Sequence, residues 1–227
     1  MIRSEVIRDD ETVRALYDKG NEILGKLGYT DHSMSHASLV AQNAGRILTE
    51  LAADEHTIEL ARMAGYLHDI GNAINRSHHA EYGALLARQI LMQYDLTTKD
   101  VIAITATVAN HDETTGFAYD EISAALILAD KADVRRNRVR TKDPSLFDIH
   151  DRVNYAVTGS NLVIDTDKKK ITLNLAIDES ICSMFDYFEI FLDRMMMCRR
   201  AAEVLNLCFR LKANGQKVLG GLSRSKF

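Results

Sequence analysis

The sequence predicts a mainly α-helical fold, in which a helical bundle is followed at the C-terminal end by a β-hairpin and one long helix. The chain of 227 residues contains one proline and no tryptophan, a composition that favours long uninterrupted helices. Apolar residues recur at helical spacing up to Pro144, and a strict apolar and polar alternation begins only after it. With 46% hydrophobic residues, the chain can bury a sizeable core as one large domain or as one domain with an appendage.

Six helices are expected before Pro144, and the short polar connections between them are typical of a compact bundle. Apolar stripes at helical spacing identify them, as with Val40, Ala44 and Ile47 in the second helix. That helix can be capped by Ser33 or Ser35. The expected helices span about residues 10–27, 33–53, 55–69, 79–94, 98–111 and 122–139.

The C-terminal part has a different pattern. The stretch NLVIDTDKKKITLNLAID, residues 161–178, alternates around a polar turn at 165–168 and predicts the β-hairpin. Residues 183–209 then place an apolar, methionine-rich stripe on one long helix, and the polar end SRSKF is expected to fray. Such a stripe is typical of a core or of a subunit interface, so a homodimer is expected to use this helix if the chain forms one. The predicted division is a helical bundle over 1–158 and an appendage over 159–227. The stripe consists of Met184, Phe188, Phe191, Met195, Cys198, Ala202, Leu205 and Phe209.

Charge and cysteine content limit the partners and the compartment. The net charge of −4 gives no global positive field, so nucleic acid is not expected as an obligate partner. The N-terminal residues carry scattered charges without an apolar leader, and no window is long and apolar enough to span a membrane. Three cysteines without a CxxC pair are typical of reduced thiols, and we expect a cytoplasmic protein.

Histidines and aspartates on otherwise apolar helical faces indicate a metal site. A lone histidine on such a face is usually a satisfied core residue, but a buried carboxylate without a partner is costly. Asp130 ends the apolar run AALILAD, and Asp69 follows His68 at the end of another apolar helix. One shared cation would satisfy these groups together, because imidazole and carboxylate are the usual ligands of divalent transition metals. The candidate ligands are His36, His68, Asp69, His79, His111 and Asp130.

The stretch AGYLHDIGN, residues 64–72, places two of these candidates side by side. Adjacent helical residues point about 100° apart, so His68 and Asp69 do not chelate as residues four apart would. They can bracket one ion, or the carboxylate can bridge two ions while the imidazole holds one. Gly71 permits a sharp exit and leaves room for ions, so we expect this helix to end in a ligand cavity.

The order of these candidates resembles that of the HD-domain superfamily of metal-dependent phosphohydrolases, over about residues 33–140. The resemblance implies an HD-domain helical bundle in which one metal is bound by His36, His68, Asp69 and Asp130. In the binuclear branch of the family, His79 and His111 would hold a second metal, with Asp69 as the bridge. One or two divalent transition-metal ions are implied, such as iron, manganese or zinc. A glycine four residues later, Gly83, favours His79 over its neighbour His78, while His32 precedes the helix and is the second choice to His36.

Departures from the family's patterns narrow the function. Many HD proteins carry lysine after HDIG, where this chain has Asn72, and the GYP sequence after the later histidine is missing. A cyclic-di-GMP phosphodiesterase is therefore disfavoured. Basic residues follow Asp130 instead, and Lys131, Arg135 and Arg138 would share one face of the expected helix. They can clamp a substrate phosphate, and the alternative is a solvated helix face.

The resemblance therefore implies an enzyme, a phosphohydrolase that acts on a small phosphorylated metabolite or nucleotide. Asp69 would be its catalytic residue, because it would hold the ions that activate the attacking water. Two other classes stay open: an HD-type di-iron oxygenase that cleaves a C–C or C–P bond, and a metal- or ligand-binding module without turnover. His150-Asp151 repeats the dipeptide after the ligand set is complete, and we expect His150 to lie at the surface or at the substrate lip.

Overall fold

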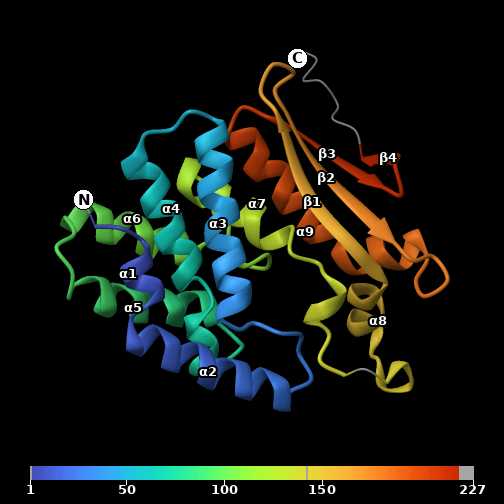
Figure 1. Ribbon diagram of the computed structural model, residues 1–227, viewed down its shortest axis with the longest axis horizontal. Coiled ribbons are helices and arrows are strands. Elements are labelled where there is room, and N and C mark those ends of the chain that lie inside the picture. The colour runs from blue at the N-terminus through green and yellow to red at the C-terminus, as the bar shows by residue number, and fades with distance from the viewer. Residues whose placement is uncertain (1, 142, 220–227) are drawn as a thin grey trace.

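The computed structural model describes residues 2–141 and 143–219, which form a helical bundle joined to a four-stranded sheet (Figure 1). The fold is mainly α-helical, as predicted. The first part contains α1 (Glu5–Arg8), α2 (Glu11–Lys26), α3 (Met34–Glu50), α4 (Glu55–Leu67), the 3-10 helix η1 (Ile70–Ala73), α5 (His79–Leu91), α6 (Thr98–Ala109) and α7 (Glu121–Lys131). The 3-10 helices η2 (Arg136–Arg138) and η3 (Pro144–Leu146) and helix α8 (Ile149–Ala156) then lead into the sheet.

Five of the seven helices α1–α7 begin where a short polar side chain satisfies a free backbone N–H group, and α1 and α5 lack such a cap. Ser33 caps α3 and accepts from the backbone N–H of Ser35. Asp54 caps α4, Thr97 caps α6, and Asp120 forms a capping box at the start of α7. The five helices predicted between residues 10 and 111 are confirmed, and their ends lie within a few residues of the predicted positions.

The helix predicted over 122–139 is wrong in its second half, because α7 ends at Lys131. Tertiary contacts of the residues that follow outweigh helical propensity. The Asp133 carboxylate binds His36 of α3, and Arg138 donates from Nη1 to the backbone carbonyl of Asp133. Arg135 between them has an extended backbone. Lys131, Arg135 and Arg138 therefore do not share one helical face.

The C-terminal part forms one sheet with the strand order β1-β2-β3-β4. The predicted hairpin is confirmed by β1 (Val157–Asp165) and β2 (Lys170–Ile177), which pair in antiparallel fashion. Helix α9 (Met184–Val204) returns the chain, so that β3 (Cys208–Ala213) pairs in parallel with β2. Strand β4 (Gln216–Leu219) pairs antiparallel with β3.

The predicted continuation of the long helix to Phe209 is wrong, because α9 ends at Val204 and Phe209 lies in β3. Phe209, Leu211 and Ala213 alternate along β3 and bury one of its faces. Asn214 and Gly215 follow with positive φ angles of 49° and 79°, as a tight hairpin turn requires. Both signals are present in the sequence, but the helical stripe before them extends by chance to Phe209.

Helix α9 joins the sheet to the bundle. It contacts α7 and β3, and its residues Met195, Cys198 and Ala202 are buried in one hydrophobic core with the bundle. The middle of the methionine-rich stripe is therefore core. Phe185 and Leu192 are the large apolar side chains that α9 leaves exposed, and a homodimer through this helix stays a prediction.

Three further expectations concern the domain boundary, the C-terminal residues and membrane-spanning helices. The predicted boundary between 158 and 159 falls inside β1, and the division into two domains stays a prediction. The end SRSKF lies outside the described residues. Among the residues that are described, no helix has both the length and the apolar character needed to cross a membrane.

Two glycines bring η1 and α5 into direct backbone contact. A Cβ atom at Gly71 would lie 1.9 Å from the carbonyl oxygen of His79 and 2.5 Å from the nitrogen of Gly83. A Cβ at Gly83 would lie 3.3 Å from the nitrogen of Gly71 and 3.3 Å from the carbonyl oxygen of His68. The two glycines are therefore halves of one contact, which brings His79 close to the His68-Asp69 pair.

We expect Gly71→Ala to destabilise the protein by about 1–3 kcal/mol, because a methyl group cannot enter this contact without moving α5. Urea denaturation measures the change in the free energy of unfolding. The control is Gly159→Ala, where the new Cβ would meet the Ala176 side chain at an ordinary 3.5 Å. Equal stability of the Gly71 variant and the parent would contradict this account of the contact.

Candidate metal centre

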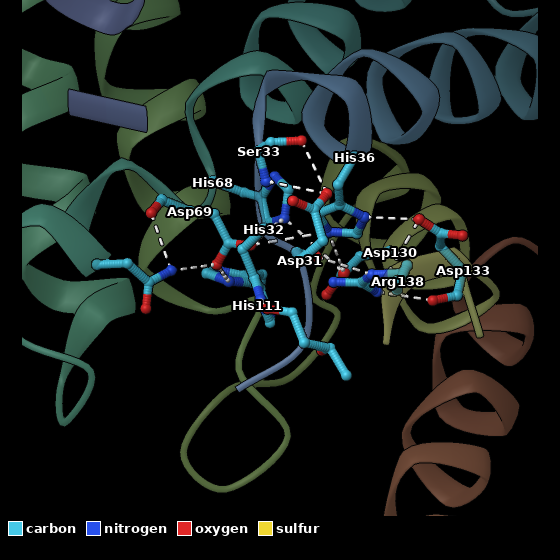
Figure 2. A network of polar contacts seen from close by, with 12 residues as sticks. Asp31, His32, Ser33, His36, His68, Asp69, His111, Asp130, Asp133 and Arg138 are labelled. Carbon is cyan, nitrogen blue, oxygen red and sulfur yellow. Dashed lines mark hydrogen bonds and ion pairs between the residues drawn. The ribbon is translucent and has the colours of Figure 1, made fainter. Parts of the chain in front are cut away.

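The six predicted ligands lie together, and Figure 2 labels five of them, all except His79. Each stands at or near the end of its helix: His36 lies in the first turn of α3, His68 directly after α4, and His79 at the start of α5. His111 follows α6, and Asp130 is the penultimate residue of α7. All six side chains are buried or nearly so, and the Asp130 side chain is the most exposed at 12%.

Asp69 lies between the two halves of this cluster. Its Oδ2 atom is 3.2 Å from Nε2 of His68 and 3.7 Å from Nε2 of His36. Its Oδ1 atom is 3.5 Å from Nε2 of His79 and 3.8 Å from Nε2 of His111. The two carboxylate oxygens thus face different pairs of imidazoles, which is the placement expected of a bridging ligand.

Among the described residues, two groups of three side chains are close enough to hold an ion. His36, His68 and Asp130 form one, and His68, Asp69 and His111 form the other, each with its ligand atoms within 4.8 Å of one another. His79 belongs to neither group, but its Nε2 lies 3.2 Å from that of His111. The structure therefore brings together all six residues that the sequence proposed, and metal binding by this exact set stays a prediction.

Hydrogen bonds at the opposite ring nitrogen fix the orientation of three imidazoles. Nδ1 of His68 lies 2.9 Å from the Gly65 carbonyl, and Nδ1 of His111 lies 2.7 Å from the Val108 carbonyl. His79 contacts the carbonyl of Arg76, again three residues earlier, at 3.1 Å. A carbonyl only accepts, so each Nδ1 carries a proton, and in the neutral ring Nε2 is the nitrogen left to bind a cation.

The resulting arrangement fits a divalent metal. Among the described residues, the Nε2 atoms of His36 and His68 are buried without a hydrogen-bond partner. The Nε2 atoms of His79 and His111 face each other as two lone pairs, which repel unless a proton or a cation lies between them. Buried, unpartnered imidazole nitrogens beside carboxylates are the donor set that divalent transition metals prefer.

Electrostatics keep the carboxylates ionised. Burial alone would raise the pKa of the Asp69 carboxyl, but His68 and His111 hold it well below its usual range. Burial likewise opposes ionisation of Asp130, and Lys131 and His36 hold its pKa well below the usual range. Burial and the neighbouring His111 lower the pKa of His79 to about 4. Near neutral pH these three groups are therefore in the protonation states that bind a cation.

Asp133 is a functional residue that the sequence reasoning missed. Its Oδ2 atom lies 2.7 Å from Nδ1 of His36, so it fixes the fourth imidazole as the carbonyls fix the other three. Arg135 donates to both carboxylate oxygens of Asp133, and Arg138 binds the backbone carbonyl. The available signal was a second aspartate in LADKAD, three residues after Asp130.

Asn72 occupies the position after HDIG and supports Asp69. Its Nδ2 donates to the Oδ1 atom of Asp69 at 2.9 Å and to the Asp69 carbonyl at 3.0 Å. Its Oδ1 accepts from Arg76 at 3.2 Å. A neutral side chain at this position therefore orients the bridging carboxylate, and Arg76 is linked to it through Asn72.

A cavity of about 400 Å³ opens beside the cluster. Of the three residues proposed to bind a phosphate, Lys131 and Arg138 line it. Arg135 is not among its lining residues and is engaged by Asp133. Lys131 Nζ lies 2.7 Å from Oδ2 of Asp130, so this lysine also orients a candidate ligand.

The alternative histidines are placed as follows. His78 is 68% exposed and directs its ring towards Glu81, away from the two groups of ligands. His32 and His150 line the cavity without belonging to either group, and His150 is 63% exposed. The geometry thus favours His79 over His78 and His36 over His32, and it places His150 at the lip.

Comparisons with known proteins agree with this geometry. A protein-family model described as HD domain matches residues 33–138. An uncharacterised protein of Methanocaldococcus jannaschii is 29% identical over 177 residues, which cover 66% of each chain. Ribonuclease Y of Alkaliphilus metalliredigens is 35% identical over 127 residues, and that of Mycoplasma mycoides is 31% identical over 126. These matches cover about half of this chain (53% and 52%), but only 24% and 27% of the two ribonucleases.

Removal of the bridging carboxylate tests the ligand set. We expect Asp69→Ala to lose most of its bound metal, because both halves of the cluster lose a shared ligand, whereas His150→Ala keeps its metal. Elemental analysis of the purified variants measures the metal content. Full occupancy in the Asp69 variant, or loss of metal in the His150 variant, would show that the assignment is wrong.

Asp133→Asn tests the support of His36. The variant retains a hydrogen-bond acceptor but loses the charge that holds the ring and the two arginines, so metal affinity should fall about 10–100-fold. Competition with a chelator of known affinity measures this change. Asp167→Asn, at an exposed position of the β1–β2 turn, is the control and should bind metal as the parent does.

Proposed function

We propose, from the match of residues 33–138 to the HD-domain family model, that the protein hydrolyses a phosphate ester of a small metabolite or nucleotide. HD domains are typically found in metal-dependent phosphohydrolases. The observation that carries the proposal is the convergence of four imidazoles with fixed orientation and two ionised carboxylates at one wall of a cavity.

A bound metal would supply an activated water at neutral pH and would neutralise the phosphoryl oxygens. The residues present fit one or two divalent transition ions. His36, His68, Asp69 and Asp130 would hold the first, and His79 and His111, with Asp69, the second. Iron, manganese and zinc all accept this mixture of nitrogen and oxygen ligands.

The protein's own side chains position these groups. Asp69 is the proposed catalytic residue because its two oxygens face both halves of the cluster, and Asn72 holds one of them in place. Lys131 holds Oδ2 of Asp130, while Oδ1 faces Nε2 of His36 at 3.3 Å. Lys131 and Arg138 also line the cavity, where cationic groups stabilise negative charge that develops on a phosphoryl group.

The size and charge of the site favour a small substrate. A cavity of about 400 Å³ lies within the range of sites for small molecules and takes one metabolite or one nucleotide unit. Relatives named ribonuclease Y make a nucleotide a reasonable part of that substrate class. The net charge of −4 offers no extended positive field for a long nucleic acid, so we do not propose RNA as an obligate partner.

A screen of phosphorylated compounds tests the proposal. The protein is purified without added metal, its metal content is determined, and release of inorganic phosphate is followed with iron, manganese or zinc. We expect turnover by the parent and a loss of more than about a hundredfold in Asp69→Ala, as for removal of a metal that activates water. Consumption of dioxygen without phosphate release would favour the di-iron oxygenase, and metal binding without either reaction would favour a binding module.

A further inference from the structure

Part of the cavity wall comes from α8 and α9, which lie outside residues 33–138. Residues 33–138 supply the metal cluster, whereas Phe191 and Arg194 of α9 reach the same cavity from outside that segment. Among the described residues, Arg194 donates one side-chain hydrogen bond, from Nη2 to Oε1 of Glu113 at 3.2 Å. The arginine is therefore a candidate for contact with whatever occupies the space beyond the metals.

The surroundings of Arg194 leave part of its guanidinium unused. Its side chain is 22% exposed and lies over the ring of Phe191, 4.5 Å from the centroid. Its Nε atom is buried and has no hydrogen-bond partner among the described residues. The exposed part of the side chain lines the cavity, where its terminal N–H groups can donate to an acceptor that enters.

The carboxylate beside Arg194 is shared between two cations. Glu113 accepts from Lys131 at 2.7 Å as well as from Arg194. Lys131 is the main cause of the lowered pKa of Glu113, which its burial would otherwise raise. Lys131 also lies 2.7 Å from Asp130, so these two cations and two carboxylates balance one another, and the shared Glu113 holds Arg194 at the cavity wall.

This wall is close to the metal cluster. Asp130 contacts Lys131 at 2.7 Å, Lys131 contacts Glu113 at 2.7 Å, and Glu113 contacts Arg194 at 3.2 Å. Three successive contacts therefore connect a candidate metal ligand to Arg194. One small molecule with its phosphoryl group at the metals can reach the guanidinium with its other end.

The charge of the cavity also favours an anion. Among the described residues that line it, six carry carboxylates and four carry cationic groups. Two bound dications would reverse this balance and leave the cavity with an excess of two positive charges. A phosphate monoester at the metals, with about two negative charges near neutral pH, would balance that excess, so this count favours an anionic ligand, and the case for a second anionic group rests on the contacts of Arg194.

We propose that Arg194, together with Lys131, forms a second anion subsite, so that the substrate carries another anionic group besides the phosphoryl group that is hydrolysed. The inference rests on the proposed function and adds the class of substrate. A guanidinium fork suits either a carboxylate or a second phosphoryl group, because both accept two parallel hydrogen bonds.

Matched pairs of compounds test the subsite. 3-Phosphoglycerate and glycerol 3-phosphate differ by a carboxylate, and adenosine diphosphate and monophosphate differ by a second phosphoryl group. Binding is measured by calorimetry on the metal-loaded protein, and phosphate release gives kcat/KM. The parent should prefer the compound with the additional anion in one pair by about 10–100-fold, as for one charge-assisted contact in a partly dry site. The pair that shows this preference tells the carboxylate from the phosphoryl group.

Variants at position 194 test whether Arg194 causes the preference for the compound with the additional anion. Arg194→Gln should abolish the preference while it leaves the metal content and the weaker compound of the pair nearly unchanged. Arg194→Lys keeps the charge without the fork and should retain part of the preference, which also covers the case that the glutamine variant does not fold. Arg199→Gln, at an exposed position of the same helix, is the matched control and should behave as the parent.

The outcomes separate the two proposals. If the parent binds both members of each pair equally, or if Arg194→Gln weakens both members equally, the second anion subsite is wrong although hydrolysis stands. If the preference in binding is present and depends on Arg194, but no compound releases phosphate, the subsite stands and phosphate hydrolysis is wrong.

Discussion

The burial of four imidazoles and two carboxylates at one point is the constraint on which the rest of the structure depends. Unpaired carboxylates are costly to desolvate, so Asp69 and Asp130 have to face imidazoles or cations. Helix ends suit such a buried cluster for two reasons. The ends of several helices converge at one place, and the last carbonyls of each helix have no partner within the helix. His68 directly follows α4, His111 lies two residues after the end of α6, and both bind free carbonyls, those of Gly65 and Val108, through Nδ1. The same contact that completes each helix end therefore directs Nε2 to the centre.

His36 shows why the segment after α7 is not helical. It lies in the first turn of its helix, where the carbonyl three residues earlier, that of Ser33, already accepts the backbone N–H of Ala37. Its Nδ1 therefore needs an acceptor from elsewhere in the chain, and Asp133 supplies one. A buried carboxylate in this position needs counter-charges in turn, which Arg135 provides. Continuation of α7 would remove these contacts, so the helix stops at Lys131.

The parts of the fold that depend on local sequence could be predicted, and the parts that depend on distant partners could not. Caps such as Asp54 and Thr97 set helix starts within the sequence itself, and the ligand order follows from the positions of charged residues on apolar faces. The role of Asp133 requires knowledge of a contact with a residue 97 positions away. Strand β3 is an intermediate case. Its alternation and the turn at Asn214-Gly215 are local, but parallel pairing with β2 decides against a longer α9.

The match to the family model covers the part of the cavity wall that carries the candidate metal ligands, but not the part that α8 and α9 form. The six candidate metal ligands lie within residues 33–138, so the match to the HD-domain family model bears on the chemistry proposed for these side chains. Phe191, Arg194 and the residues of α8 lie beyond that segment, on elements that belong to the C-terminal part of this chain. A binding site discriminates through the groups that contact the variable part of the substrate, and in the proposed subsite those groups would come from α8 and α9. The choice of substrate is therefore to be sought first in the contacts of Arg194, outside the segment that matches the family model.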